Sequence, residues 1–495
     1  MNIIDNDLLS IQESRILAEN AREAQKKLAT FSQEKLDQIV ENMAREISHY
    51  ANELAKLSSD ETDYGIWQDK YIKNRFVCEY LPAALQGMRC VGIIREDEKN
   101  KTMDVGVPVG VIAALCPATS PVSTTIYKAL IAVKSGNAMI FSPHPRAKNV
   151  MGRTLDVLIS AAEESGLPEG ALAYLHTVTQ SGTVELMNHP ATSLIINTGV
   201  PGMLKAAHQS GKPVIFGGAG NGPAFIERTA DIKQAVRDII ISKTFDNGIV
   251  SAAEQSIVVD SCIHQEVKKE LEQNGAYFMT DEEANKLGAL LFRPDGSLDS
   301  EMVGKNAREL AKKAGFFVSS NVVLLLSEQK YVFDKNPYSK EKLCPVLAYY
   351  IEDDWMHACE KCIELLLSER NGHTLVIHSK DEDVIRQFAL KKPVGRVLVN
   401  TPATFGSMGV TTNLFPAMTL GSGSAGEGIT TDNVSPMNLI YVRKVGYGVR
   451  KPEAIGLSEE RVFSAELPVQ QPGINQENMK MLQRILEGVI SELKR

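Results

Sequence analysis

Short apolar, β-branched runs alternate with helix-like stretches from residue 110 onward, and this alternation limits the fold more than any other feature. The apolar runs are Gly110–Leu115, Ala138–Phe141, Ser193–Ile196 and Val214–Phe216, and the helix-like stretches between them cover residues 123–134, 147–165 and 203–210. Strands that alternate with helices form a parallel sheet with helices on its faces. The sequence therefore predicts an α/β fold.

A second series of the same kind follows in about residues 225–405. Its predicted helices cover residues 231–243, 264–274, 281–288 and 305–314, and its predicted strands cover residues 256–259, 322–326 and 346–350. A chain of 495 residues is long enough for two or three domains. We therefore predict one α/β domain in residues 1–224, completed by about 406–450, and another in 225–405.

The N-terminal part has a different pattern. Apolar residues at helical spacing predict helices within residues 8–58, with Leu36, Ile39 and Met43 on one face. Two short strands are predicted at 91–94 and 103–107, separated by a charged run.

Composition and charge narrow the class of protein. The formal net charge of −8 argues against a nucleic-acid partner. No run is long enough for a transmembrane helix, and the N-terminus lacks the pattern of a signal peptide. Cys359 and Cys362 form the only CxxC spacing, and no second pair completes a metal site. We expect a cytoplasmic protein with no disulfide framework, no metal and no membrane partner.

One turn stands out between the predicted helix 231–243 and the predicted strand at 256. Asp246-Asn247-Gly248 is a strong turn signal, and Ser251 follows it just before the strand. Such a turn can present one side chain to a cleft. Taken alone, the same pattern also suits an ordinary surface turn.

This segment resembles the nucleophile segment of the CoA-acylating aldehyde dehydrogenases, which include half of the bifunctional aldehyde/alcohol dehydrogenases. In that family a Phe-Asp-Asn-Gly turn leads, after two residues, to a catalytic cysteine and then to Glu-Gln-Ser. The matching residues here are Phe245, Asp246, Asn247, Gly248, Glu254, Gln255 and Ser256, and Ser251 occupies the cysteine position. The resemblance covers about residues 10–450. It implies two Rossmann-like domains, the first binding the dinucleotide and the second catalytic, with an oligomerisation flap near residues 92–108.

The resemblance also implies an NAD site, although no GxGxxG sequence follows the first strand. The cofactor-binding residues that it implies are Thr119, Ser120, Ser142, Pro143, His144, Thr198, Gly199, Gly217, Gly218 and Glu341. The Thr119-Ser120 pair departs from the more usual Thr-Asn of the family. His373 lies in a family Gly-His-Thr motif and is the second expected catalytic residue, whereas a lone loop histidine is more often structural.

In the family reaction a thiolate attacks the aldehyde, hydride passes to NAD, and the resulting thioester is transferred to coenzyme A. Aldehyde dehydrogenases that hydrolyse the thioester carry a glutamate just before a Gly-Gly pair. Here Ile215 and Phe216 precede Gly217-Gly218, and neither can act as a base. This favours transfer to coenzyme A.

Ser251 does not suit that chemistry, because a hydroxyl lacks the accessible anion of a thiol. Three readings stay open: an engineered Cys-to-Ser substitution, a natural non-catalytic homologue, and a serine-based enzyme. We expect the form with Ser251 to be inactive or nearly so.

The expected function is NAD-dependent oxidation of a short aldehyde, such as acetaldehyde or propionaldehyde, to its acyl-CoA. Succinate semialdehyde and sulfoacetaldehyde remain as charged alternatives. A non-catalytic binding or assembly subunit is the alternative of another class. The resemblance implies a homodimer or a larger homo-oligomer.

The C-terminal tail lies beyond the part that resembles the family. A linker is predicted at 451–474, followed by a helix at 475–495 with Asn475 as its N-cap. Its apolar stripe consists of Leu482, Ile485, Leu486, Val489, Ile490 and Leu493. This arrangement resembles the peptides that direct enzymes into bacterial microcompartments by binding a shell protein. Docking on the protein's own body or across a dimer is the alternative.

Overall fold

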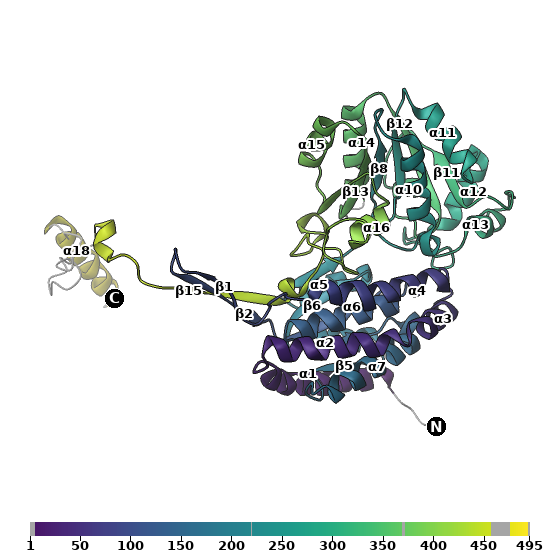
Figure 1. Ribbon diagram of the computed structural model, residues 1–495. Coiled ribbons are helices and arrows are strands. Elements are labelled where there is room, and N and C mark those ends of the chain that lie inside the picture. Colours follow the sequence, from purple (N-terminus) through teal and green to yellow (C-terminus); the bar gives the residue numbers. More distant parts are fainter. Residues whose placement is uncertain (1–4, 219, 369–371, 457–475, 494–495) are drawn as a thin grey trace. The chain divides into compact units, whose positions relative to one another are not determined.

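The computed structural model describes residues 5–218, 220–368, 372–456 and 476–493 (Figure 1). It consists of two units. The first contains residues 1–95 and 104–443, and the second contains residues 96–103 and 444–495. No helix in the described part of the chain is both long enough and apolar enough to span a membrane.

The first unit contains two parallel sheets. The smaller sheet has the strand order β5-β4-β3-β6-β7. Its strands are β3 (Val111–Leu115), β4 (Ala138–Ser142), β5 (Leu172–Tyr174), β6 (Thr192–Thr198) and β7 (Val214–Gly217). The prediction of a parallel α/β sheet in this region is confirmed. β3 is buried along its whole length, as expected for a central parallel strand covered on both faces.

The helices within residues 6–209 pack around this sheet. They are α1 (Asn6–Leu28), α2 (Gln33–Ser48), α3 (Ala51–Thr62), α4 (Trp67–Arg75), the π-helix η1 (Phe76–Tyr80), α5 (Leu81–Leu85), α6 (Pro121–Lys134), α7 (Lys148–Glu164), α8 (Gln180–Asn188) and α9 (Leu204–Gln209). In α2 the predicted apolar face is buried, and Ser32 caps the helix by accepting a hydrogen bond from Lys35 N. The helical character predicted for residues 8–58 is confirmed.

The larger sheet has seven strands in the order β10-β11-β12-β9-β8-β13-β14, and neighbouring strands are parallel. They are β8 (Pro223–Ile226), β9 (Ser256–Asp260), β10 (Ala276–Phe278), β11 (Leu324–Glu328), β12 (Val346–Glu352), β13 (Thr374–His378) and β14 (Arg396–Val399). The domain boundary predicted between residues 224 and 225 falls inside β8.

Side chains of this sheet alternate between two cores. Val258 of β9 packs with α12 (Asp281–Leu291), α13 (Ala307–Lys313), α14 (Trp355–Ser368) and α15 (Glu382–Leu390). Its neighbours Ile257 and Val259 pack on the opposite face with α10 (Ile232–Thr244), α11 (His264–Gln273) and α16 (Ala403–Met408). This two-residue period places helices on both faces of the sheet, as Figure 1 shows.

A third sheet has the order β1-β2-β15, with β1 (Gly92–Asp97), β2 (Thr102–Pro108) and β15 (Ile440–Gly446). The two strands predicted near residues 91–107 are therefore confirmed. In the second unit, α18 (Gln476–Glu492) buries none of its residues, so the predicted apolar stripe is exposed. The predicted linker lies mostly outside the described residues, and Asn475 lies outside them too.

Candidate functional site

The strand order of the smaller sheet reverses at β3, and the carboxyl edge of the sheet at this strand is the candidate site. After β3 the chain adds β4 and β5 on one side, and it then returns to add β6 and β7 on the other side. Ligands in open α/β sheets bind in the crevice at such a switch point. Gly199, which follows β6, has φ +64, and a Cβ there would lie 2.9 Å from Pro117 Cβ, after β3. The two loops thus approach closely only because residue 199 is glycine.

A central cavity of about 230 Å³ opens at this switch point. Its lining consists of Pro117, Thr119, Ser120, Thr124, Thr198, Gly199, Pro201, Gly217, Gly218, Ile249, Val250, Ser251, Leu298, Glu341, Leu343, Met408, Ala417, Met418 and Leu420. The structure therefore brings Ser251 together with seven of the predicted cofactor residues: Thr119, Ser120, Thr198, Gly199, Gly217, Gly218 and Glu341.

A side cavity lies at the same edge of the sheet and contains the other three predicted cofactor residues. Ser142, Pro143 and His144 line it, together with the start of α8. The hydroxyls of Ser142 and Thr183 are 2.8 Å apart. Burial is the main cause that lowers the pKa of His144 below its usual value. This imidazole is therefore neutral at physiological pH. Its Nδ1 accepts from Arg146 N at 3.1 Å, which leaves the Nε2–H as a donor for a ligand.

These two cavities lie where a dinucleotide binds in an open α/β sheet, at the switch point. The loops after β3 and β6 line both of them. A bound nicotinamide would supply the hydride acceptor in this crevice.

The turn before Ser251 has an unusual backbone. Asp246, Asn247 and Gly248 all have positive φ, at 48°, 53° and 73°. Non-glycine residues in this region are strained unless neighbouring groups hold them. Asn247 Nδ2 donates to Gly304 O at 2.8 Å, and Asp69 Oδ2 accepts from Asp246 N at 2.7 Å. Two hydrogen bonds, to the Asp69 side chain and from the Asn247 side chain, therefore hold the predicted turn.

The Asp246 carboxylate is fully buried between two lysines of α4. Its Oδ2 accepts from Lys73 Nζ at 2.5 Å and from Lys70 Nζ at 3.1 Å, and its Oδ1 accepts from Ile66 N at 2.6 Å. Burial lowers the pKa of Lys70 to about 8, and the Asp246 charge opposes this shift. The lysines also reach the cavity wall, because Lys73 Nζ donates to Ser120 Oγ at 2.7 Å and Lys70 Nζ donates to Thr119 O at 3.1 Å.

We call Lys70, Lys73 and Asp246 the lysine cluster. The sequence alone does not single out its two lysines. Lysines on a polar helix normally face solvent, and nothing in the sequence of α4 marks these two as buried. Only the contact with Asp246, far away in the sequence, explains their position.

His373 lies beside the backbone of residue 251. A Cβ on Gly220 would lie 1.9 Å from Ser251 O and 2.6 Å from His373 Nε2. His373 Nδ1 pairs with Thr374 Oγ1 at 2.8 Å, and its Nε2 has no partner among the described residues. Burial lowers the pKa of His373 to about 3, so the imidazole is neutral. His373 does not line either cavity.

Two carboxylates lie near Ser251. Glu341 lines the central cavity, and its Oε1 accepts from Gly220 N at 2.6 Å. Glu254 is buried behind the turn, where its Oε1 accepts from Ala403 N at 2.9 Å. Burial raises the pKa of Glu254 to about 7. Ile215 and Phe216, which precede the Gly217-Gly218 pair, are buried in the core.

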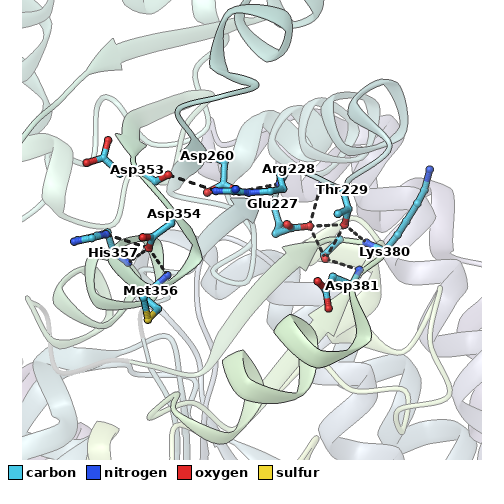
Figure 2. A network of polar contacts seen from close by, with 11 residues as sticks. Glu227, Arg228, Thr229, Asp260, Asp353, Asp354, Met356, His357, Lys380 and Asp381 are labelled. Atoms are coloured by element: carbon cyan, nitrogen blue, oxygen red, sulfur yellow. Dashed lines mark hydrogen bonds and ion pairs between the residues drawn. The ribbon is translucent and has the colours of Figure 1, made fainter.

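The carboxyl edge of the larger sheet, in contrast, is closed by a polar network (Figure 2). Glu227 Oε2 accepts from Thr229 N at 2.9 Å and from Ser379 Oγ at 2.8 Å. Asp260 Oδ2 accepts from Arg228 N at 2.9 Å and from its Nε at 3.0 Å. These bonds join the ends of β8, β9 and β13 to one another. In the described part of the chain, no group of three or more His, Cys, Asp or Glu residues could hold a metal ion.

The sequence of this chain is similar to the sequences of curated dehydrogenases. The bifunctional aldehyde-alcohol dehydrogenase AdhE of Escherichia coli (strain K12) is 37% identical over 441 residues, which is 88% of this chain and 49% of that protein. The chain thus spans about half the length of that relative. The succinate-semialdehyde dehydrogenase (acetylating) of Clostridium kluyveri is 33% identical over 440 residues, which is 89% of this chain and 96% of that protein.

Solved structures are also similar. An acetylating aldehyde dehydrogenase from Geobacillus thermoglucosidasius is 42% identical with a TM-score of 0.88, covering 91% of this chain and 99% of that one. A propionaldehyde dehydrogenase from a Clostridium phytofermentans bacterial microcompartment is 29% identical with a TM-score of 0.79, covering 87% and 96%. A Rhodopseudomonas palustris propionaldehyde dehydrogenase with bound propionyl-CoA is 26% identical with a TM-score of 0.79, covering 88% and 94%.

The aldehyde dehydrogenase family model matches residues 10–413, which is most of the chain. The TM-scores of 0.79–0.88 to the three solved structures agree with this match. The chain therefore belongs to the aldehyde dehydrogenase family.

Proposed function

We propose that this chain is built as an acylating aldehyde dehydrogenase, which oxidises a short uncharged aldehyde with NAD and transfers the acyl group to coenzyme A. The observation that carries the proposal is the central cavity, where residue 251 and the loops of the dinucleotide crevice meet. The acetylating and propionaldehyde dehydrogenases among the similar structures support the reaction class. The relative with bound propionyl-CoA supports coenzyme A as the acceptor.

Residue 251 is the position for the nucleophile. It lies three positions after Gly248, the last residue of the strained turn, and is half-buried in the cavity wall. With a thiol at this position, attack on the aldehyde carbonyl would give a tetrahedral adduct, and loss of hydride would leave a thioester. The serine hydroxyl of this chain is a far weaker nucleophile at neutral pH. We therefore propose that the form with Ser251 has little or no activity.

The cavity lacks a base suited to hydrolysis of the thioester. Glu341 is the only carboxylate among the described residues that line it, and its Oε1 is held by Gly220 N. The residues before Gly217-Gly218 are the apolar Ile215 and Phe216. Without an activated water the thioester would persist until a thiol such as coenzyme A accepts the acyl group. Acyl-CoA is accordingly the proposed product.

The lining of the cavity favours an uncharged substrate. Ile249, Val250, Leu298, Leu343 and Met418 supply apolar side chains, and no lysine or arginine is present among the described residues of the lining. A carboxylate or sulfonate would lose its water there without gaining a cationic partner. The volume of about 230 Å³ holds roughly seven water molecules. Acetaldehyde and propionaldehyde fit this chemistry better than succinate semialdehyde or sulfoacetaldehyde.

The experiment is NADH formation by the Ser251→Cys protein, with NAD, coenzyme A and a panel of charged and uncharged aldehydes. We expect rates far above those of the unchanged chain, highest with the two short uncharged aldehydes. Chromatography should then show acyl-CoA and not free carboxylate. Mostly carboxylate would contradict the proposed acceptor, and preference for succinate semialdehyde would contradict the proposed substrate class.

A second proposal concerns α18. Its apolar residues Leu482, Ile485, Leu486, Val489 and Ile490 are each about half exposed, at 48–56%. A short amphipathic helix of this kind is stabilised by docking. One similar structure comes from a bacterial microcompartment. We propose that this helix binds a shell protein and takes no part in catalysis. Deletion of residues 475–495 from the Ser251→Cys protein should keep its turnover and abolish its co-purification with shell proteins, whereas loss of turnover would contradict the proposal.

A further inference from the structure

The Lys73 ammonium connects two walls of the central cavity. It donates to Asp246 Oδ2 at 2.5 Å and to Ser120 Oγ at 2.7 Å. Asp246 belongs to the turn that precedes residue 251, and Ser120 follows β3 on the other side of the crevice. Lys73 is 1% exposed and Asp246 is fully buried, so water does not compete for these bonds. One buried cation therefore fixes the distance between the turn and the Ser120 hydroxyl.

The direction of this hydrogen bond determines what the hydroxyl can do. An ammonium only donates, so Ser120 Oγ is the acceptor, and its own proton is not used by Lys73. Ser120 stands at the N-cap position of α6, yet its side chain makes no capping hydrogen bond. The residue lines the same cavity as Ser251. Its hydroxyl proton can therefore be donated into the cavity.

Such a hydroxyl is well suited to a carbonyl oxygen. When a nucleophile at residue 251 attacks a carbonyl, the oxygen gains negative charge, and fixed donors in a dry site stabilise that charge most. A hydroxyl that accepts a hydrogen bond from a buried cation is itself a stronger donor. Lys70 provides the contrast within the cluster, because its second partner is the Thr119 carbonyl and not a hydroxyl.

We infer that Lys73 is a positioning residue that orients and polarises the Ser120 hydroxyl. The Ser120 hydroxyl then donates a hydrogen bond to the carbonyl oxygen of the substrate. This inference rests on the proposed function, since it concerns the same carbonyl addition. Asp246 anchors Lys73, and the strained turn thereby sets residue 251 and the donor hydroxyl at a fixed separation.

A double-mutant cycle tests the inference. The parent is the full chain with Ser251→Cys and Cys262→Ser, because Cys262 is an exposed thiol that would react with the probes. The cycle consists of Ser120→Ala, Lys73→Met and the combination of both. Lys70→Met is the matched control, and Lys73→Arg is the conservative variant that keeps the charge. Two reactions are followed: aldehyde oxidation with NAD and coenzyme A, and release of nitrophenolate from p-nitrophenyl acetate, which needs neither cofactor.

We expect Ser120→Ala to lower kcat about 10²-fold, the order found for loss of one oxyanion donor, with little change in KM. Lys73→Met should lower kcat similarly and add less than about threefold in the Ser120→Ala background, because both changes remove the same donor. Lys73→Arg should restore part of the rate. The effect of Lys70→Met, which does not act through a hydroxyl, should be additive with that of Ser120→Ala.

Other results overturn the inference. Unchanged kcat in Ser120→Ala does so even if Lys73→Met fails to fold, because this variant leaves the lysine cluster intact. Additive effects of Ser120→Ala and Lys73→Met show a merely structural lysine. If the cycle is non-additive with the ester while no aldehyde is oxidised, the proposed function fails and the inference stands. If aldehydes are oxidised and the cycle is additive, the inference fails and the function stands. No acylation by either substrate overturns both.

Discussion

Asp246→Asn should destabilise the protein strongly, because it removes the only carboxylate that the structure shows bound to both buried lysines of the cluster. The side chains of Lys70, Lys73 and Asp246 are 3%, 1% and 0% exposed, so water cannot replace the lost charge. Removing one partner of a buried ion pair costs about 3–5 kcal/mol. We expect a loss of that size in the free energy of unfolding at neutral pH, measured by urea denaturation.

The loss should also depend on pH. The pKa of Lys70 is already lowered to about 8 with Asp246 present, against an ordinary value of 10.5. Without the carboxylate it falls further, so the native state holds fewer protons than the unfolded state at pH values between the lowered pKa and 10.5. Stability then rises with pH in this window, and the deficit of Asp246→Asn should be smaller at pH 9 than at pH 6.

Two further variants serve as comparisons for Asp246→Asn. Glu79→Gln breaks the exposed Arg75–Glu79 pair in the adjoining helical segment and should leave stability unchanged within error. Adding Lys73→Met to Asp246→Asn should recover part of the loss, because one uncompensated ammonium disappears. A loss in Asp246→Asn as small as that in Glu79→Gln, with no recovery on adding Lys73→Met, would refute the reasoning about the lysine cluster.

Two further predictions concern the surroundings of residue 251. Gly220→Ala in the Ser251→Cys protein should lower kcat about 10²-fold, because the new Cβ would lie 1.9 Å from Ser251 O; Gly448→Ala, with nothing within 4 Å, is the control, and equal rates for the two would contradict the close approach. Glu254 has a pKa raised to about 7 from 4.5, so the native state keeps a proton that the unfolded state has lost, and stability falls as pH rises from 4.5 to 7. Glu254→Gln should remove this loss, worth about 3 kcal/mol by pH 8; equal pH dependence of unfolding in both proteins would show that Glu254 is not the cause.

The regular part of the fold was predictable from the sequence. β3 and β4 are apolar runs followed by long helices, and such alternation has few other solutions. Among the strands that were not predicted, β5, β8 and β10 have only three or four residues each, too few for a two-residue period to show. They were recognised only by their pairing with longer neighbours.

The candidate site was predictable where it depends on turn chemistry. Asp246-Asn247-Gly248 requires a left-handed backbone, and these residue types adopt it at the lowest cost, so the turn before Ser251 was visible in the sequence. The lysine cluster was not, because its bonds join residues more than 170 positions apart. The position of His373 beside Gly220 likewise arises from the packing of β13 against β8 and leaves no local trace.

The most direct test of the central claim is acylation of residue 251 itself. The Ser251→Cys protein is incubated with acetyl-CoA or propionyl-CoA without cofactor, digested, and examined by mass spectrometry. The thiol should attack the acyl-CoA and form a thioester, since acyl transfer is reversible. We predict an acyl adduct that fragmentation of the peptide locates on residue 251 itself, and none on residue 251 in the unchanged chain. An adduct confined to the exposed Cys262, or no adduct in the Ser251→Cys protein, would contradict the assignment of residue 251 as the nucleophile position.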